Sequence, residues 1–287
     1  MAEQKKIKET IAINNDFDLL TRSYQEHAIG QINFARYSVL YAREFSDELG
    51  SIFANVKNSY KSKILRKDIK NIVKKNGRDI WILVTANNKL YGDIILRSFK
   101  LFEERIKENR SDKVDLVIIG RQGKNYMEAS GMNKPFEYFE LPDNNVTVDY
   151  LKKISEKLIY YENIYVVYGK FNNLVSQTPV QISLTGDVLE SASNDPEAEK
   201  KRNFLFEPSI EEILSFFENQ ILALLLNQTV QEAQLARFAS RINAMETAQV
   251  NIQKQLARLV KKDKLFRVRE MNKKQSELLA GRALWNK

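Results

Sequence analysis

The residues that could perform chemistry in this chain are few, and their spacing matches no common phosphate-binding pattern. Dinucleotide and Walker loops place glycines directly after a strand, because close backbone approach supplies N–H donors to phosphate. Here the first apolar run is followed by residues 85–92 (TANNKLYG), and the nearest glycine pair, Gly120 and Gly123 in GRQG, lacks the rest of either pattern. We therefore predict that these glycines serve turns and packing, and that the chain binds neither ATP nor NAD.

Other candidate catalytic groups are equally sparse. The chain has no cysteine, so it has no thiol nucleophile, disulfide or Cys-ligated zinc. Its single histidine, His27, falls on a helical repeat and is expected to be a polar coiled-coil residue. The acid pairs at 103–104 and 211–212 are typical of solvated helix faces. We predict a chain that is not an enzyme by itself and that binds no metal or cofactor.

Positive charge is concentrated near the C-terminus. The 287 residues include 45 Lys and Arg against 37 Asp and Glu, which gives a net charge of +8. Only Asp263 and Glu270 oppose the nine bases of residues 254–274, which we call the basic run: Lys254, Arg258, Lys261, Lys262, Lys264, Arg267, Arg269, Lys273 and Lys274. Such a run attracts an acidic partner or nucleic acid, or is a solvated face. Because Phe266 is its only aromatic residue, a stacking platform for single strands is weakly supported.

The element that carries this run is a long helix. Residues 209–280 contain no Gly or Pro over 72 positions, and charges interrupt every window long enough to cross a membrane. A pattern of this length is typical of a coiled coil. Its predicted seam advances by alternating steps of three and four and therefore requires a partner helix; the members are Leu235, Phe238, Ile242, Met245, Gln249, Ile252, Leu256, Leu259, Asp263 and Phe266.

The N-terminal residues offer that partner. A weaker and more polar alternation starts at Ile13, and its next members are Phe17, Leu20 and Tyr24. We predict one helix to about residue 75, packed against the C-terminal helix as an antiparallel coiled coil. An ordinary helical bundle is the alternative, although no third helix of matching length is predicted.

Between the two helices the composition changes to that of an α/β domain. Three apolar runs, residues 80–85, 114–119 and 164–168, alternate with helix-like segments at 91–107, 124–130 and 148–160, and residues 176–184 add a further strand. We predict an N-terminal coiled-coil helix (1–76), a small, mainly parallel, Rossmann-like α/β domain (77–186), a flexible loop and linker (187–207) and a C-terminal coiled-coil helix (208–287). Residues 1–8 are charged with no apolar segment after them, so we expect no signal peptide and an intracellular, soluble chain.

Short motifs follow these elements in a recognisable order. Residues 206–209 (FEPS) lead into the last helix, where Glu232, Ala236-Arg237, Asn243-Ala244 and Ala248 follow. The insert contains residues 120–123 (GRQG), 167–171 (VYGKF) and 176–179 (SQTP). In this order and on this architecture, the motifs resemble the gamma subunit of F-type rotary ATPases, the central stalk that turns inside a ring of three alpha and three beta subunits.

That resemblance implies a function and a set of partners. It implies a rotor shaft whose asymmetry holds each beta subunit at a different nucleotide stage, with Mg-ATP and ADP bound by the ring and not by this chain. The basic run would meet acidic levers of the ring, and an apolar tip would serve as a bearing; its residues are Leu278, Leu279, Leu284 and Trp285. An epsilon-like subunit and a membrane rotor ring are further implied partners, with the complex at the inner face of the cell membrane.

The departures from the family pattern are also informative. Residues 85–92 keep only Leu90 and Gly92 of the family's SDRGLCGG, and residues 18–28 lose most of the positive charge of its N-terminal helix. They favour a divergent member, such as the rotor of an F-like motor that drives motility in place of proton transport. Two other classes stay open: a coiled-coil scaffold, and a nucleic-acid-binding protein that uses the basic helix, of which nucleic acid is the less favoured partner.

Overall fold

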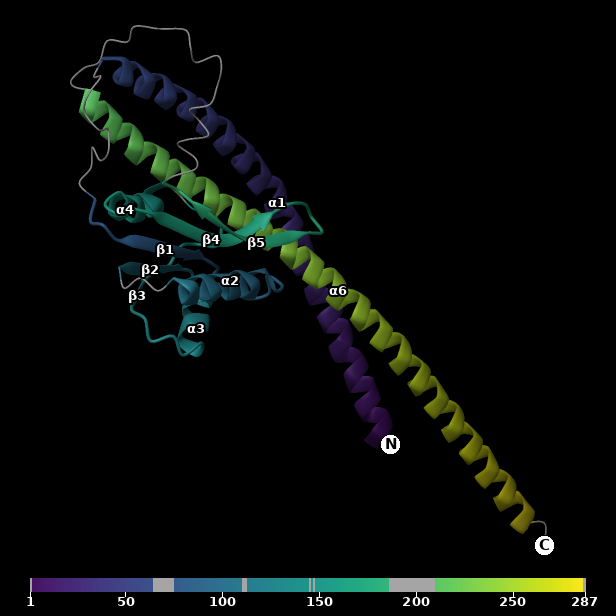
Figure 1. Ribbon diagram of the computed structural model, residues 1–287. Coiled ribbons are helices and arrows are strands. Elements are labelled where there is room, and N and C mark those ends of the chain that lie inside the picture. The colour runs from purple at the N-terminus through teal and green to yellow at the C-terminus, as the bar shows by residue number, and fades with distance from the viewer. Residues whose placement is uncertain are drawn as a thin grey trace. The chain divides into compact units, whose positions relative to one another are not determined.

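The computed structural model describes residues 2–63, 75–109, 113–144, 146, 148–185 and 210–285 (Figure 1). It divides into two compact units, residues 1–28 with 242–287, and residues 29–241. Helices α1 (Ala2–Lys63) and α6 (Ile210–Trp285) contribute to both units. The predicted loop at 187–207 and the predicted end of the first helix near residue 75 fall largely outside the described residues.

The first unit is an antiparallel pair of helices, as predicted. Near the start of α1, Gln4 Nε2 donates to Asp263 Oδ1 at 3.4 Å, and Lys262 pairs with Glu3 at 3.3 Å. Farther along α1, Gln25 Nε2 donates to Glu246 Oε2 at 2.8 Å. Residue numbers thus rise on α1 as they fall on α6, which establishes the antiparallel direction.

On α6 the buried edge follows the predicted alternation of three and four. Within this unit Met245 and Asp263 are buried, and Ile242, Ile252, Leu256 and Leu259 are half-buried. Asp263 is a polar member of the seam, and it accepts from Gln4 while pairing with Arg267 at 2.9 Å. The two earliest members, Leu235 and Phe238, are buried in the second unit.

On α1 the predicted seam is wrong by one residue. Phe17, Leu20 and Tyr24 are exposed by 53%, 51% and 41%. From Asn14 to Gln25 each covered position lies one residue after a predicted one. The buried and half-buried positions of α1 in this unit are Gln4, Ile7, Ile11, Asn14, Asp18, Thr21, Gln25 and Ala28. Small and polar side chains at the seam permit close approach of the two helices and allow bonds such as that of Gln25 to Glu246. The sequence pattern selected the bulkiest apolar side chains, which in this helix lie on a different face.

The second unit contains a five-stranded sheet in the order β3-β2-β1-β4-β5. Its strands are β1 (Asp79–Val84), β2 (Val114–Ile119), β3 (Phe136–Phe139), β4 (Ile164–Phe171) and β5 (Gln177–Ser183). The first four are parallel, and β5 is antiparallel to β4. The mainly parallel α/β domain is confirmed, and β3 is the strand that the sequence did not predict.

Helices cover both faces of this sheet. Helices α2 (Ile94–Glu108) and α3 (Arg121–Ala129) pack on one face, where Phe99, Phe102, Ile106 and Met127 meet Trp81, Leu83, Leu116, Ile118 and Val167. On the other face, α4 (Val148–Leu158) and the first part of α6 supply Leu151, Ile154, Leu158, Ile221, Leu222, Leu225, Leu226, Val230 and Ala233. The start of α6 is therefore part of the hydrophobic core of the α/β domain.

The glycines of GRQG serve turn and packing roles, as predicted. Gly120 has a φ of +97°, and a Cβ there would lie 2.7 Å from Thr85 Oγ1 and 2.8 Å from the Ala86 nitrogen. A Cβ on Gly123 would lie 2.8 Å from Ile118 Cγ2. Both glycines allow the start of α3 to approach the end of β1.

Replacing Gly120 by alanine should therefore lower the free energy of unfolding by roughly 3 kcal/mol, because the new methyl combines an unfavourable φ with a backbone clash. Urea unfolding measures this change. Gly131→Ala is the matched control, since Gly131 also has positive φ (+72°) but no neighbouring atom within 4 Å of the new Cβ. An equal loss in both variants would contradict the packing role.

Candidate functional site

The carboxyl end of β1 leads into a loop, residues 85–92, that organises the neighbouring strand ends. Thr85 Oγ1 donates to the Ile119 carbonyl at 2.6 Å and accepts from the Gly123 N–H at 3.0 Å. The Asn87 side chain donates to the Leu141 carbonyl at 2.6 Å and accepts from the Arg121 N–H at 3.0 Å. The loop thus connects β1, α3 and the segment after β3.

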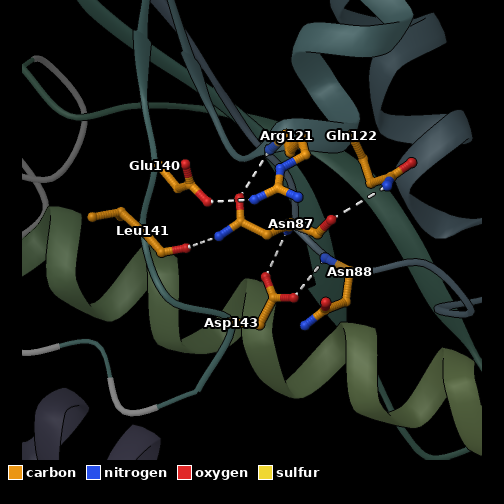
Figure 2. Close-up of polar contacts among 7 residues, drawn as sticks. All are labelled: Asn87, Asn88, Arg121, Gln122, Glu140, Leu141 and Asp143. Carbon is orange, nitrogen blue, oxygen red and sulfur yellow. Dashed lines mark hydrogen bonds and ion pairs between the residues drawn. The ribbon is translucent and has the colours of Figure 1, made fainter.

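The Asp143 carboxylate accepts hydrogen bonds from two backbone N–H groups of this loop (Figure 2). Asp143 accepts from the Asn87 N–H at 2.7 Å with one oxygen and from the Asn88 N–H at 2.8 Å with the other. Its side chain is buried. Successive N–H groups at this edge of a parallel sheet form the usual place for a phosphate. Here they already hold an anion, which agrees with the absence of a phosphate loop in the sequence.

Replacing Asp143 by alanine should destabilise the protein by about 1–3 kcal/mol, because the N–H groups of the half-buried Asn87 and the exposed Asn88 would lose their charged acceptor. Asp143→Asn keeps one acceptor oxygen and should cost less. Chemical denaturation of both variants checks this order. Unchanged unfolding midpoints would mean that the carboxylate does not hold the loop.

Helix α6 is attached to the same loop by two arginines, Arg237 and Arg241, which we call the arginine clamp. Arg237 Nη1 donates to the Thr85 carbonyl at 2.8 Å. Arg241 donates from Nε to the Leu90 carbonyl and from Nη2 to the Lys89 carbonyl, each at 3.1 Å, and its guanidinium carbon lies 3.8 Å from the centre of the Tyr91 ring. The planar fork of Arg241 thereby fixes two successive carbonyls of the loop.

Further contacts extend the attachment along α6. One turn before the clamp, Gln234 Nε2 donates to the Asp143 carbonyl at 2.8 Å, and Glu232 accepts from the Tyr168 hydroxyl at 2.8 Å. One residue before Arg241, Ser240 lies so close to Gly92 that a Cβ on the glycine would be 2.5 Å from Ser240 Oγ. These contacts are specific to α6 residues 232–241 and give the helix a fixed rotation against the loop.

Burial of the clamp shifts the pKa values of Arg237 and Tyr91. Both arginines are 5% exposed. Desolvation lowers the pKa of Arg237, with a smaller opposing contribution from Tyr91, and desolvation also raises the pKa of Tyr91. Arg237 Nε has no hydrogen-bond partner among the described residues. A buried cation that donates to a carbonyl and lies over an aromatic ring is costly to leave without these partners, so we expect the loss of either partner to destabilise the protein.

The candidate ring-contact residues lie on the far part of α6. All nine members of the basic run are exposed, and so are Leu278 and Leu279. Three of the bases are in surface ion pairs, Lys262 with Glu3, Arg267 with Asp263 and Lys273 with Glu277. The side chains of Leu284 and Trp285 are outside the described part of the structure. The structure places the described members of this surface on a single helix.

The remaining predicted candidates form no catalytic centre. His27 is exposed on α1, and Glu103 pairs with Lys107 on the surface of α2. Within the described ranges, no three His, Asp or Glu side chains gather in a way that could hold a metal ion. A search of the same residues finds no helix with the length and apolar character to cross a membrane.

A long helix, anchored by buried arginines to a small α/β domain and continued as an antiparallel coiled coil, defines a stalk-type protein. The model of the ATP synthase family (ATP-synt) matches residues 3–281, and the chain belongs to this family. It is 27% identical over 292 residues to the ATP synthase gamma chain of Malacoplasma penetrans, covering 97% of this chain and 95% of that one. It is 23% identical over 289 residues to the gamma chain of Halothermothrix orenii, covering 98% of each.

Solved structures show the same fold. A chain of the central stalk and c-ring of Tetrahymena thermophila mitochondrial ATP synthase matches with a TM-score of 0.58 and 18% identity, over 80% of this chain and 99% of that one. A chain of Euglena gracilis mitochondrial ATP synthase matches with a TM-score of 0.53 and 14% identity, over 88% and 93%.

Proposed function

We propose that this chain is the central rotor shaft, or gamma subunit, of an F-type or F-like ATPase. The observation that carries the proposal is the continuity of α6. Its residues 232–241 are bound to the α/β domain by the arginine clamp and its neighbours, and the same 76-residue helix continues into the coiled coil. A shaft needs a helix that runs without a break between its two parts, because torque applied to one end must appear at the other.

In this role the chain supplies asymmetry and no chemistry. A single shaft meets three chemically identical beta-like subunits differently and holds each at a different stage of nucleotide binding, and rotation permutes those stages. Mg-ATP and ADP bind to the ring, and this chain is non-catalytic. The occupied N–H donors at Asp143 support this assignment.

The proposed partners are alpha-like and beta-like ATPase subunits, with an epsilon-like subunit and a membrane rotor ring in a complete synthase. The solved relatives are described with a c-ring and with F1 and OSCP, which supports the same assembly here. The complex would lie at the inner face of the cell membrane, with this chain as a peripheral subunit.

A second candidate is the rotor of a variant F-like motor used for motility. The altered residues 85–92 and the loss of basic residues from 18–28 favour this candidate, because both regions differ from the family pattern.

Isolation of the native complex tests the proposal. Alpha-like and beta-like ATPase subunits should co-purify with this chain, and the remaining subunits separate the two candidates: a membrane rotor ring supports a synthase, and its replacement by other proteins supports the variant motor. Recovery of nucleic acid or of scaffold partners without ATPase subunits would reject both.

The isolated chain should not bind Mg-ATP in the micromolar range, which corresponds to about −8 kcal/mol. Asp143 already satisfies the backbone donors that a phosphate would need. Calorimetric titration of Mg-ATP and NAD into the purified chain measures this. Saturable micromolar binding would contradict the non-catalytic assignment.

A further inference from the structure

The turn that leads into β1 contains the one Asn-Gly pair of the sequence, Asn76 and Gly77. An asparagine followed by glycine is prone to form a cyclic imide, because glycine has no Cβ to hinder attack by its peptide nitrogen on the amide carbon. Both residues are exposed, and Gly77 adopts a φ of +67°. Outside its chain neighbours, no atom lies within 4 Å of the position that a Cβ on Gly77 would occupy. The space beside the attacking nitrogen is therefore open.

The fold bends the Asn76 side chain over the Gly77 peptide. Asn76 Oδ1 accepts a hydrogen bond from the Arg78 N–H at 2.9 Å, which closes an Asx turn. The ring closed by this bond includes both the Asn76 amide carbon and the Gly77 nitrogen, so the two atoms that must join are kept within one tight turn. The Arg78 N–H also donates to the oxygen on which negative charge develops during the attack, and such a donor stabilises the transition state.

Hydrogen bonds on both sides hold this turn in place. The Asn76 N–H donates to the Tyr160 carbonyl at 2.8 Å, and the Arg78 carbonyl accepts from the Glu162 N–H at 2.8 Å. The Arg78 guanidinium is paired with Asp115, and its Nε donates to Asp115 Oδ2 at 3.0 Å. Folding therefore keeps the Asn76 side chain bent toward the Gly77 nitrogen.

We propose that Asn76 is a site of spontaneous deamidation in the folded chain. The Gly77 nitrogen loses its proton and attacks Asn76 Cγ. The new N–Cγ bond replaces the Cγ–Nδ2 bond, and Nδ2 takes up a proton and leaves as ammonia. Water then opens the imide, at Cγ to give aspartate or at the main-chain carbonyl to give isoaspartate. The reaction needs no oxidant and no enzyme, and the inference is independent of the proposed rotor function.

The two products affect the fold differently. Aspartate keeps an acceptor for the Arg78 N–H and adds one negative charge to an exposed side chain. Isoaspartate inserts an extra methylene into the backbone, between the hydrogen bonds that the turn makes to Tyr160 and Glu162. Because the spacing of these two bonds is set by the segment between α4 and β4, the isoaspartyl form should unfold at a lower urea concentration than the aspartyl form.

Mass spectrometry of peptides from the purified full chain, aged in heavy-oxygen water, tests the proposal. Asn76 should lose its amide, incorporate one heavy oxygen and yield both products, at a rate that rises with pH because the attacking nitrogen must lose its proton. Asn173 is the matched control in the same molecule, since it is exposed and its Oδ1 accepts from the Val175 N–H at 3.0 Å in the same kind of turn, but Leu174 follows it. Asn173 should keep its amide. Equal loss at both positions, or retention at Asn76, would overturn the proposal.

Unfolding isolates the contribution of the turn. The native chain should lose the Asn76 amide at least as fast as the same chain in concentrated guanidinium chloride, and a much slower loss in the native chain would mean that the fold protects Asn76. Asn76→Gln keeps an amide but changes the geometry of ring closure, so its peptide should show no mass change. Circular dichroism checks that this exposed substitution leaves the fold intact. A mass change that persists in this variant would assign the reaction to another residue and reject the site.

Discussion

Replacing Arg237 by alanine should lower the free energy of unfolding by about 3 kcal/mol, because the change opens a cavity and leaves the Thr85 carbonyl without its donor. The side chain is 5% exposed and lies between α6 and the loop after β1. Urea unfolding followed by circular dichroism measures the loss. An effect below about 1 kcal/mol would mean that the clamp does not hold the helix.

Two further variants resolve the cause of that loss. Arg237→Met keeps most of the volume, so its remaining destabilisation reports the hydrogen bond to Thr85. Arg105→Ala is the surface control, since the Arg105 side chain is 45% exposed and pairs with Glu108 at 2.8 Å on the surface of α2. Exposed pairs of this kind contribute about 0.2–1 kcal/mol.

Replacing Lys261, Lys262, Lys264, Arg267 and Arg269 together by alanine should lower the ATPase turnover of the assembled complex about tenfold, which corresponds to about 1.4 kcal/mol of activation free energy. All five side chains are exposed, so the fold should remain intact. Lys262→Ala alone should be nearly silent, because single exposed ion pairs are weak. Steady-state ATPase assays of reconstituted complexes measure the effect.

A control of equal charge isolates the position of these residues. Lys100, Arg105, Lys107, Lys134 and Lys170 are exposed on the α/β domain, and their replacement by alanine removes the same charge without touching the shaft. That variant should retain higher turnover than the first. Equal turnover in both, together with loss of nucleic-acid binding only in the first, would favour the nucleic-acid-binding class instead.

The sheet was predictable because its strands are continuous apolar runs. The predicted run at 114–119 coincides with β2, and residues 80–85 and 164–168 fall on β1 and β4 with small differences at the ends. Strand β3 was missed because it has only four residues, none of them fully buried, and so produces no run to detect.

The seam of α1 was not predictable from hydrophobicity, because most of the covered side chains are small or polar. Asn14 and Ala28 are buried while Phe17 is exposed. A repeat of apolar residues at steps of three and four indicates an apolar face on a helix. It does not identify the partner that covers that face.

The attachment of α6 to the loop at residues 85–92 also could not be predicted from sequence patterns. Its contacts join residues far apart in the chain, such as Arg237 with Thr85 and Gln234 with Asp143. The only sequence signal was indirect: Glu232 and Arg237 belong to the motif that resembles the gamma family.

The central claim, that this chain is a rotor, is tested most directly by watching it turn. A bead attached at Ala129→Cys, an exposed position on α3 in a chain without native cysteine, reports rotation of the α/β domain relative to an immobilised alpha/beta ring. On addition of Mg-ATP the account predicts unidirectional rotation in three equal steps per turn. A bead that stays fixed while the complex hydrolyses ATP would contradict it.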